Sequence, residues 1–249
     1  MKIRKEQMEA FSEAGAQNFE DHMVEYLWEY FPGQCEVLTE DVVRTVIRHG
    51  MERAGNHEIE TERDLSYYIT LMFLLGSHFD EDPQVPWAAD MLADEKLRDD
   101  LYRLDRLYAR AMEYLDEAAG ENDEHLDELA RLHGKSIDDL QDDGEGDFET
   151  RMLAQLRSLY SKKLEALGED IARALLKTGR KQAKGHGLTA DRSAGVFISL
   201  MFLLGSGFDV DPQFPWAAEV LGDRSIRGED ARTDALYAAA QAYLRRWLT

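Results

Sequence analysis

Cysteine is almost absent from this chain of 249 residues: Cys35 is the only one, so no disulfide can form within the chain. Proline is scarce too, with five residues. The longest apolar run, residues 194–204, is far shorter than the ~20 residues that a membrane span needs. The first residues are charged, and we expect no signal peptide there. These absences predict a cytoplasmic protein that does not span a membrane.

Basic residues are outnumbered: 29 lysines and arginines stand against 50 acidic residues, for a net charge of −21. A field of this sign repels nucleic-acid phosphate and anionic membranes, and it attracts basic partners. We therefore expect a basic protein surface as the partner, and neither nucleic acid nor membrane. The alternative is an acidic surface that only keeps the protein soluble.

Familiar catalytic motifs are missing as well. The sequence contains no Gly-x-Ser-x-Gly elbow, no P-loop, no His-Glu-x-x-His and no Cys-x-x-Cys, and these motifs mark common hydrolase, nucleotide, zinc and redox sites. We expect a protein without a cofactor that is not an enzyme.

What the sequence does contain is a long internal repeat. Residues 69–92 return as residues 198–221 with 18 of 24 positions identical, at an offset of 129 that holds from about 19–115 to 148–244. This predicts a tandem duplication. We expect one helical unit over 1–115 and another over 148–249, with an acidic join over 116–147 that either links the units or begins the second. Two such units could pack about a pseudo-twofold axis, like a homodimer fused into one chain.

Apolar residues are spaced by three and four and rarely alternate, so we predict an all-α fold with four to five helices in each unit. Thr39 and Thr61 are the expected N-caps of two of these helices. The Leu-Met-Phe-Leu-Leu segments at 71–75 and 200–204 belong either to buried helices or to an exposed groove. In the first unit the predicted helices cover residues 6–30, 40–53, 62–75 and 96–115, and a short helix opens at Pro86.

Two Asp-x-Asp-Pro-Gln-x-Pro-Trp segments supply the clearest candidates for chemistry. Paired carboxylates can hold Mg²⁺, Mn²⁺ or Ca²⁺, because these ions prefer oxygen ligands. The alternative is structural: the aspartates cap helix starts and hold a proline-rich turn, while Trp87 and Trp216 lock the turn into the core. The candidate metal ligands are Asp80, Asp82, Asp209 and Asp211.

Two histidines also match across the repeat. His57 and His186 each stand in a turn between predicted helices, where a histidine could titrate near neutral pH or bind metal. Neither has a second ligand at a suitable spacing, so the alternative is a turn residue or a partner of a helix end. Cys35 is matched by Leu164, which predicts a small apolar role rather than a nucleophile.

The acidic join holds thirteen acidic and two basic residues over 116–147. We predict that its carboxylates contact a basic partner. Eight basic residues gather over 157–184, and they could dock the join or an acidic partner. The candidate partner-binding residues are Asp116, Glu117, Asp123, Glu124, Asp138, Asp139, Asp142 and Asp143.

Three stretches carry a resemblance: Ile3-Arg-Lys-Glu-Gln-Met-Glu-Ala-Phe, Phe19-Glu-Asp-His-Met, and Leu71-Met-Phe-Leu-Leu-Gly with the Phe-Asp-x-Asp-Pro-x-x-Pro-Trp-Ala that follows. Together they resemble a group of small helical proteins encoded beside type VI secretion effectors in Gram-negative bacteria. The resemblance covers most of the first unit and, through the repeat, much of the second.

This resemblance implies an accessory role and names no activity. The expected function is that of an immunity protein, which neutralises an effector by binding it, or of an adaptor that loads the effector for secretion. Two alternatives from the residues stay open: a divalent-metal enzyme built on the Asp-x-Asp-Pro segments, and an acidic mimic of nucleic acid. The oligomeric state is not predicted.

Overall fold

The structure is a computed structural model that describes residues 5–98, 102–119, 134, 136–137 and 146–247. Over these residues the chain forms thirteen helices and no strand, which confirms the all-α fold class. None of these helices has the length and apolar character that crossing a bilayer demands.

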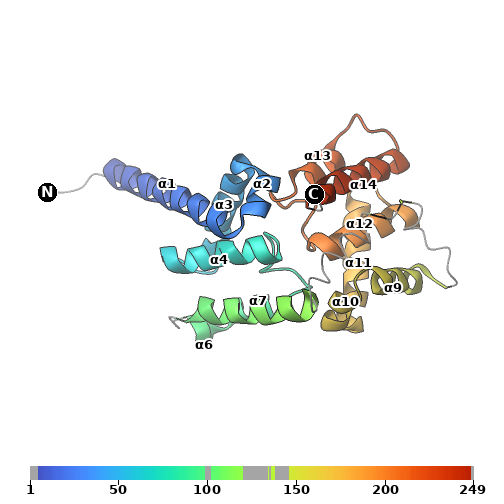
Figure 1. The fold of residues 1–249 in the computed structure, drawn as a ribbon, viewed down its shortest axis with the longest axis horizontal. Coiled ribbons are helices and arrows are strands. Elements are labelled where there is room, and N and C mark those ends of the chain that lie inside the picture. Colours follow the sequence, from blue (N-terminus) through green and yellow to red (C-terminus); the bar gives the residue numbers. More distant parts are fainter. Residues whose placement is uncertain (1–4, 99–101, 120–133, 135, 138–145, 248–249) are drawn as a thin grey trace.

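The helices follow one another in two runs (Figure 1). The first run comprises α1 (Lys5–Tyr30), α2 (Pro32–Leu38), α3 (Glu40–Gly55), α4 (Glu62–Leu75), α5 (Pro86–Ala93), α6 (Glu95–Arg98) and α7 (Arg103–Ala119). The second run comprises α9 (Phe148–Leu159), α10 (Ser161–Leu167), α11 (Glu169–Gly185), α12 (Asp191–Leu204), α13 (Pro215–Gly222) and α14 (Glu229–Arg245).

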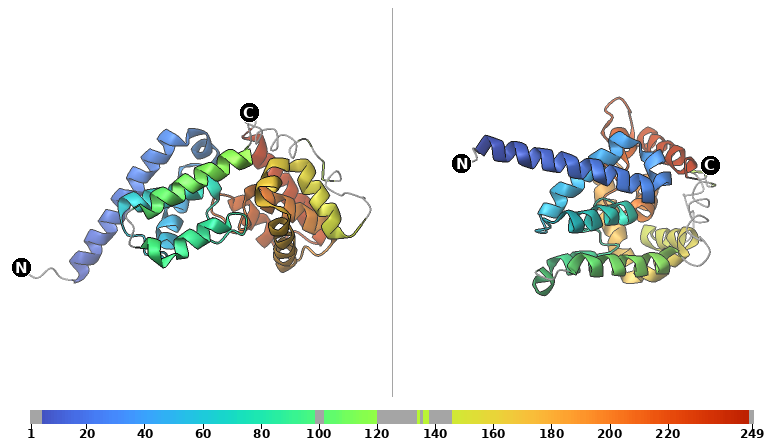
Figure 2. Two further views of the ribbon diagram at one scale, coloured as in Figure 1. Left: turned by 90° about the horizontal axis from the view of Figure 1, so that it is seen from below. Right: turned by 60° about the vertical axis from the view of Figure 1, so that its left-hand side comes forward.

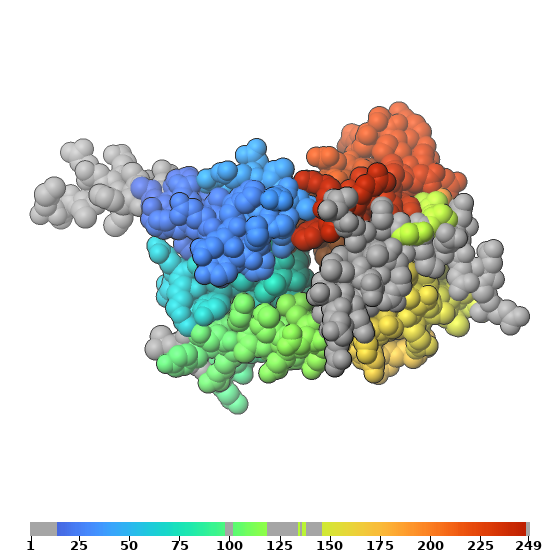
Figure 3. All heavy atoms as spheres, in the orientation of Figure 1, coloured from blue at the N-terminus to red at the C-terminus, as the bar shows by residue number. Residues whose placement is uncertain are grey.

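The two runs of helices lie side by side, and the N-terminal part of α1 extends away from the rest (Figures 1 and 2). Buried apolar side chains form two clusters, one within residues 19–114 and one within residues 152–244 that also takes in Val37 of α2. Contacts between the two sides include α7 against α10 and a hydrogen bond of 3.0 Å from Arg246 to the Glu36 carbonyl. We call residues 1–119 the first half and residues 148–249 the second half; they occupy opposite sides of the space-filling view (Figure 3).

Two glycines at equivalent positions let helices approach closely. A Cβ atom on Gly50 of α3 would lie 2.7 Å from Ile69 Cγ1 of α4, and one on Gly179 of α11 would lie 2.7 Å from Ile198 Cγ1 of α12. Any side chain here would push the helices apart. The close approach brings the turn after α3 next to the turn after α4, and the turn after α11 next to the turn after α12.

The central helices of both halves are buried, as the helical interpretation predicted. Leu71, Met72 and Phe73 are almost inaccessible, and Leu200–Phe202 of α12 are equally enclosed. The groove alternative for these segments is therefore wrong. Cys35 is fully buried, and burial raises the pKa of its thiol to about 11, which confirms its apolar role.

Some predicted boundaries need correction. The chain continues past Pro32 into the short helix α2, and the helix predicted over 96–115 is interrupted between α6 and α7. Thr61 does cap α4, because its hydroxyl accepts the Asp64 amide at 3.1 Å. Thr39 does not cap α3: it closes α2 at φ 78°, ψ 154°, and its side chain makes no capping bond. Gly168, its equivalent, has the same conformation at φ 80°, ψ 154°.

Candidate functional site

The candidate site lies in the turns that follow α4 and α12. Each helix stops at a glycine with positive φ, 98° at Gly76 and 103° at Gly205, a conformation that residues with a Cβ rarely adopt. The space is also tight, because a Cβ on Gly205 would lie 3.3 Å from Asp82 Oδ2. The turns then present the Asp-x-Asp pairs before α5 and α13 begin, each with proline in its first turn as predicted.

Asp80 is bound by residues of its own half. The Arg53 guanidinium donates to Oδ1, with Nε at 3.1 Å. On the other oxygen, His57 Nε2 lies at 2.8 Å and the Tyr68 hydroxyl donates at 2.7 Å. Burial alone raises the pKa of Asp80, but the hydrogen bonds from His57, Arg53 and Tyr68 outweigh burial and lower the pKa to about 2. This ionised carboxylate ties its turn to α3, α4 and the turn between them.

Asp209 makes a simpler version of the same contact. His186 Nε2 lies 2.7 Å from Asp209 Oδ2 across 23 residues of sequence, which is the separation of the first histidine–aspartate pair. The positions equivalent to the arginine and the tyrosine hold Gln182 and Phe197. The histidine–aspartate pair is therefore common to both halves, whereas the other two contacts belong to the first half.

Asp82, by contrast, reaches across to the second half. Its Oδ2 accepts the Ser206 amide at 2.8 Å, and its Oδ1 accepts the Ser206 hydroxyl at 2.6 Å. Asp211 reaches in the opposite direction, because its Oδ2 accepts the Ser77 amide at 2.7 Å. Both serines and both aspartates are equivalent positions of the repeat, so the two contacts are reciprocal.

Two glutamines make a second reciprocal pair. Gln84 Nε2 donates to the Met201 carbonyl at 2.9 Å, and Gln213 Nε2 donates to the Met72 carbonyl at 2.8 Å. These carbonyls belong to the last turns of α12 and α4, so each half holds the end of the other half's central helix. The pairs differ in one contact: Gln34 donates to Gln213 Oε1 at 2.8 Å, whereas Gln84 Oε1 has no partner within the described chain.

These side chains form a buried polar layer between the halves. Asp82 is 5% exposed and Asp211 is 3% exposed, and burial raises the pKa of Asp211 against the opposing hydrogen bonds from Ser77 and Gln213. A buried carboxylate is costly unless its hydrogen bonds are satisfied, so this layer fixes one arrangement of the halves. We call it the polar seam: Ser77, Asp82, Gln84, Ser206, Asp211 and Gln213.

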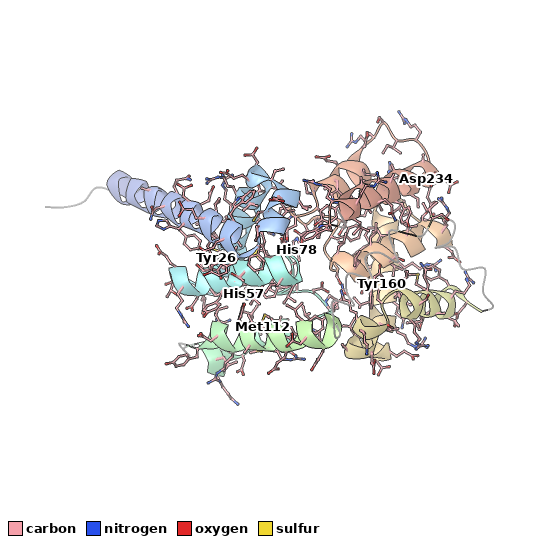
Figure 4. All side chains as sticks on the ribbon, viewed as in Figure 1. Tyr26, His57, His78, Met112, Tyr160 and Asp234 are labelled. Atoms are coloured by element: carbon pink, nitrogen blue, oxygen red, sulfur yellow. The ribbon has the colours of Figure 1, made fainter. Side chains whose placement is uncertain are left out.

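His78 breaks the reciprocity next to the seam. The equivalent residue is Gly207, and a Cβ there would lie 2.9 Å from Cγ and Cδ2 of His78. The imidazole packs on His49 with ring centroids 5.2 Å apart, and Nε2 of each ring is buried with no hydrogen-bond partner among the residues that the structure describes. Burial lowers the pKa of His49. Figure 4 shows His78 at the side of the first half that faces the second.

The four aspartates predicted as metal ligands serve different partners. Asp80 and Asp209 bind the histidine of their own half, while Asp82 and Asp211 bind the opposite half. Within the described ranges, no three histidine, cysteine or acidic side chains are grouped so that they could hold a metal ion. Both oxygens of Asp80, Asp82 and Asp211 already accept hydrogen bonds, so a cation would have to displace those donors.

Of the acidic residues predicted to bind a partner, the structure describes two. Asp116 and Glu117 are exposed near the C-terminal end of α7. The other six lie outside the described residues: Asp123, Glu124, Asp138, Asp139, Asp142 and Asp143.

Sequence reasoning named the two histidines and the four aspartates, but it missed the histidine–aspartate pairing and the serines and glutamines of the seam. One signal was available for the pairs, because the same 23-residue spacing separates the two residues in each half. The serines and glutamines belong to the repeated block, but serine and glutamine side chains at these positions form no motif that predicts their hydrogen bonds from sequence. Comparison with protein-family models, with curated proteins and with solved structures finds no match for this chain.

Proposed function

We propose that this chain is a non-enzymatic binding protein of the cytoplasm. Two homologous helical units, over 1–115 and 148–249, form one scaffold about a pseudo-twofold axis, and the scaffold presents an acidic surface to a basic protein. Together with the resemblance to type VI accessory proteins, this favours an immunity protein that neutralises an effector by direct binding. An adaptor that loads the effector is the second form of the same proposal.

Reciprocal contacts support the paired scaffold. Within each half, Arg103 donates to the His57 carbonyl and Arg232 donates to the His186 carbonyl, each at 3.1 Å, so the duplicated unit keeps the same internal contact. Between the halves, the polar seam supplies matched pairs of contacts. A duplicated unit that kept the contacts of a homodimer would produce such matched pairs. The most strongly repeated polar residues are therefore occupied in holding the molecule together, which leaves the diverged surfaces to carry function.

The two halves differ strongly in charge. Residues 1–119 contain 27 acidic and 12 basic residues, whereas residues 148–249 contain 12 acidic and 15 basic residues. The helical scaffold is similar in both, so this difference is not needed for the fold. An acidic first half suits capture of a basic partner, because complementary charge speeds association and selects partners.

One observation carries the proposal: two acidic residues lie at the C-terminal end of the first-half helix α7, where the helix dipole disfavours negative charge. Asp116 and Glu117 lie near the C-terminal end of α7, and α7 has no basic residue in its last turn. The equivalent residues of α14 are Arg245 and Arg246. A negative charge there opposes the helix dipole and costs about 0.3–1 kcal/mol. Residues that reduce stability at an exposed site are better explained by binding than by folding.

The divalent-metal enzyme receives less support than binding. The aspartates it would use are occupied by arginine, histidine, serine and backbone donors. The same contacts explain why these residues recur in both halves without any catalytic role.

Co-expression with the product of the neighbouring effector gene tests the proposal. We expect a complex that co-elutes in size-exclusion chromatography and weakens as salt rises, because exposed charges are screened. Asp116→Arg/Glu117→Arg should weaken this complex at least tenfold. Glu219→Arg, an exposed charge reversal in the second half, should leave it unchanged.

Cell growth separates the two forms of the proposal. An immunity protein restores the growth of cells that express the effector, whereas an adaptor binds the effector and does not protect. Absence of any complex at low salt, with both proteins folded, would overturn the binding function.

A further inference from the structure

Exposed aromatic side chains concentrate at one place in the described structure, the C-terminal part of α1. Tyr26 is 38% exposed, Trp28 is 36% exposed and Tyr30 is 60% exposed. Tyr26 and Tyr30 pack on each other with ring centroids 4.7 Å apart. Figure 4 places Tyr26 near the end of α1. Large aromatic rings left in water at neighbouring positions mark interaction surfaces.

Two glutamates lie among these rings. Glu25 and Glu29 are exposed, and no ion pair to either is found within the described chain. Residues three or four positions apart are neighbours on the surface of a helix. Trp28 therefore lies beside Glu25, Glu25 lies beside Glu29, and Glu29 lies beside Tyr26. The acids therefore occupy the middle, with Trp28 on one flank and the tyrosine pair on the other. We call Glu25, Tyr26, Trp28, Glu29 and Tyr30 the aromatic–acidic face.

The second half shows that the scaffold does not need this face. The equivalent residues are Ala154, Gln155, Arg157, Ser158 and Leu159, with neither an aromatic ring nor an acid among them. Gln155 and Leu159 are buried. The aromatic–acidic face is therefore present in the first half alone. A surface that the repeated fold does not require is best explained by binding.

Its chemistry selects one kind of occupant. A guanidinium group stacks on aromatic rings and pairs with carboxylates at the same time, whereas an ammonium group is more strongly hydrated and stacks less well. The chain itself contains such stacking, with the Arg180 guanidinium 4.3 Å from the Phe148 ring centroid. Two acids between aromatic flanks thus suit arginine better than lysine.

We propose that the aromatic–acidic face docks an arginine-bearing segment of a basic protein partner. This proposal rests on the binding function proposed above, and it assigns that function a surface on α1. The acids attract the segment, and the rings hold its guanidinium groups.

The test uses the full chain and two fluorescein-labelled peptides, nona-arginine and nona-lysine, in fluorescence anisotropy at low salt. We expect nona-arginine to bind at least fivefold more tightly than nona-lysine. The triple variant Tyr26→Ala/Trp28→Ala/Tyr30→Ala should lose this preference and weaken nona-arginine binding at least tenfold. Glu25→Gln/Glu29→Gln should weaken both peptides. All five side chains are on the surface, and circular dichroism checks that the variants stay helical.

Matched controls are Tyr102→Ala, an aromatic residue exposed elsewhere at 63%, and Glu219→Gln in the second half. Both should bind like the unmodified chain. Equal affinity for the two peptides, or an equal loss in the Tyr102 control, would overturn the proposal in favour of unspecific charge attraction.

The effector co-expression experiment keeps the two proposals apart. If the effector binds the triple variant as well as the unmodified chain, binding stands and the assigned surface is wrong. If no effector binds but the arginine preference is lost in the triple variant, the surface stands and the proposed partner is wrong.

Discussion

Ser206 donates both its amide and its hydroxyl to the carboxylate of Asp82, at 2.8 Å and 2.6 Å, across 124 residues of sequence. The equivalent carboxylate, Asp211, receives the Ser77 amide at 2.7 Å across 134 residues. From its own half each aspartate accepts a backbone amide, that of Gln84 for Asp82 and that of Gln213 for Asp211, both at 2.8 Å. Their position in the most strongly repeated segment is explained by contact between the halves.

Replacing Asp82 with alanine should lower the free energy of unfolding by about 1–3 kcal/mol, because the buried Ser206 amide loses its acceptor. Asp211→Ala should have a similar effect for the same reason. Urea denaturation at neutral pH measures both changes. The exposed Asp90 is the control, and Asp90→Ala should stay within about 0.5 kcal/mol. Unfolding of Asp82→Ala at the same urea concentration as the unmodified chain would show that the seam is not stabilising.

Acid should weaken the contact around Asp80. Its pKa is lowered from 3.8 to about 2 in the folded protein. Between these two pH values the carboxyl group is ionised in the folded state and protonated in the unfolded state. The contact therefore stabilises the fold above about pH 4, by about 2 kcal/mol, and this contribution is lost as the pH falls to about 2.

Asp80→Asn should remove that part of the pH dependence and lower stability at neutral pH. Urea denaturation in steps between pH 7 and pH 2 measures it. Asp209→Asn is the matched variant, and it should cost less at neutral pH, because no arginine or tyrosine of the described ranges pairs with the Asp209 carboxylate as Arg53 and Tyr68 do with Asp80. An unchanged pH profile in Asp80→Asn would contradict the assignment.

His78 and Gly207 should be coupled. Gly207→Ala places a methyl group about 2.9 Å from the imidazole, and overpacking of this kind costs about 1–3 kcal/mol. His78→Ala removes the Cγ and Cδ2 contacts and leaves its own Cβ 3.0 Å away, so the double variant should recover part of the loss caused by Gly207→Ala. A double-mutant cycle in thermal or urea unfolding measures the coupling. Simple additivity of the two changes would show that the residues do not compete for space.

Thr39 should be a site of backbone strain. It has φ 78° and ψ 154°, a region that is essentially restricted to glycine and costs other residues about 1–3 kcal/mol. Thr39→Gly should therefore raise the free energy of unfolding. The reverse exchange at the equivalent site, Gly168→Thr, should lower it. Opposite signs in urea denaturation support the interpretation, and destabilisation by Thr39→Gly would refute it.

Charge reversal at a first-half helix end should separate stability from binding. Asp116→Arg, which copies the arginine at position 245, should stabilise the chain by about 0.3–1 kcal/mol, because a positive charge suits a helix C-terminus. The same change should weaken binding of a basic partner. Thermal unfolding together with a co-elution assay measures both effects. If Asp116→Arg gains stability and binds the partner with unchanged affinity, Asp116 does not contribute to binding.

Much of the helical framework was predictable from local pattern. Apolar spacing located α1, α3 and α4, and the Thr61 cap marked the start of α4 correctly. Thr39 was assigned the wrong role because a threonine before an acidic segment usually caps a helix, whereas here the backbone closes α2 in a conformation that places the hydroxyl elsewhere. The split between α6 and α7 was missed because leucine spacing continues across it.

The candidate site was also predictable only in part. The repeat identified Asp80 and Asp82 as important, but these two residues, two positions apart, bind different halves. Side chains two apart in a turn can point in opposite directions, and only their surroundings decide which partner each one meets.

By itself, the sequence determined the all-helical class, the internal repeat, the acidic charge and the absence of a disulfide, because each depends on local spacing or on composition. Only the tertiary structure decided that the repeated aspartates, serines and glutamines join the halves, that His78 requires a glycine opposite it, and which aromatic rings of α1 stay in water. These are contacts between residues more than a hundred positions apart, or exposures set by neighbouring helices. No local pattern carries that information, because the partners meet only after both halves have folded and packed together.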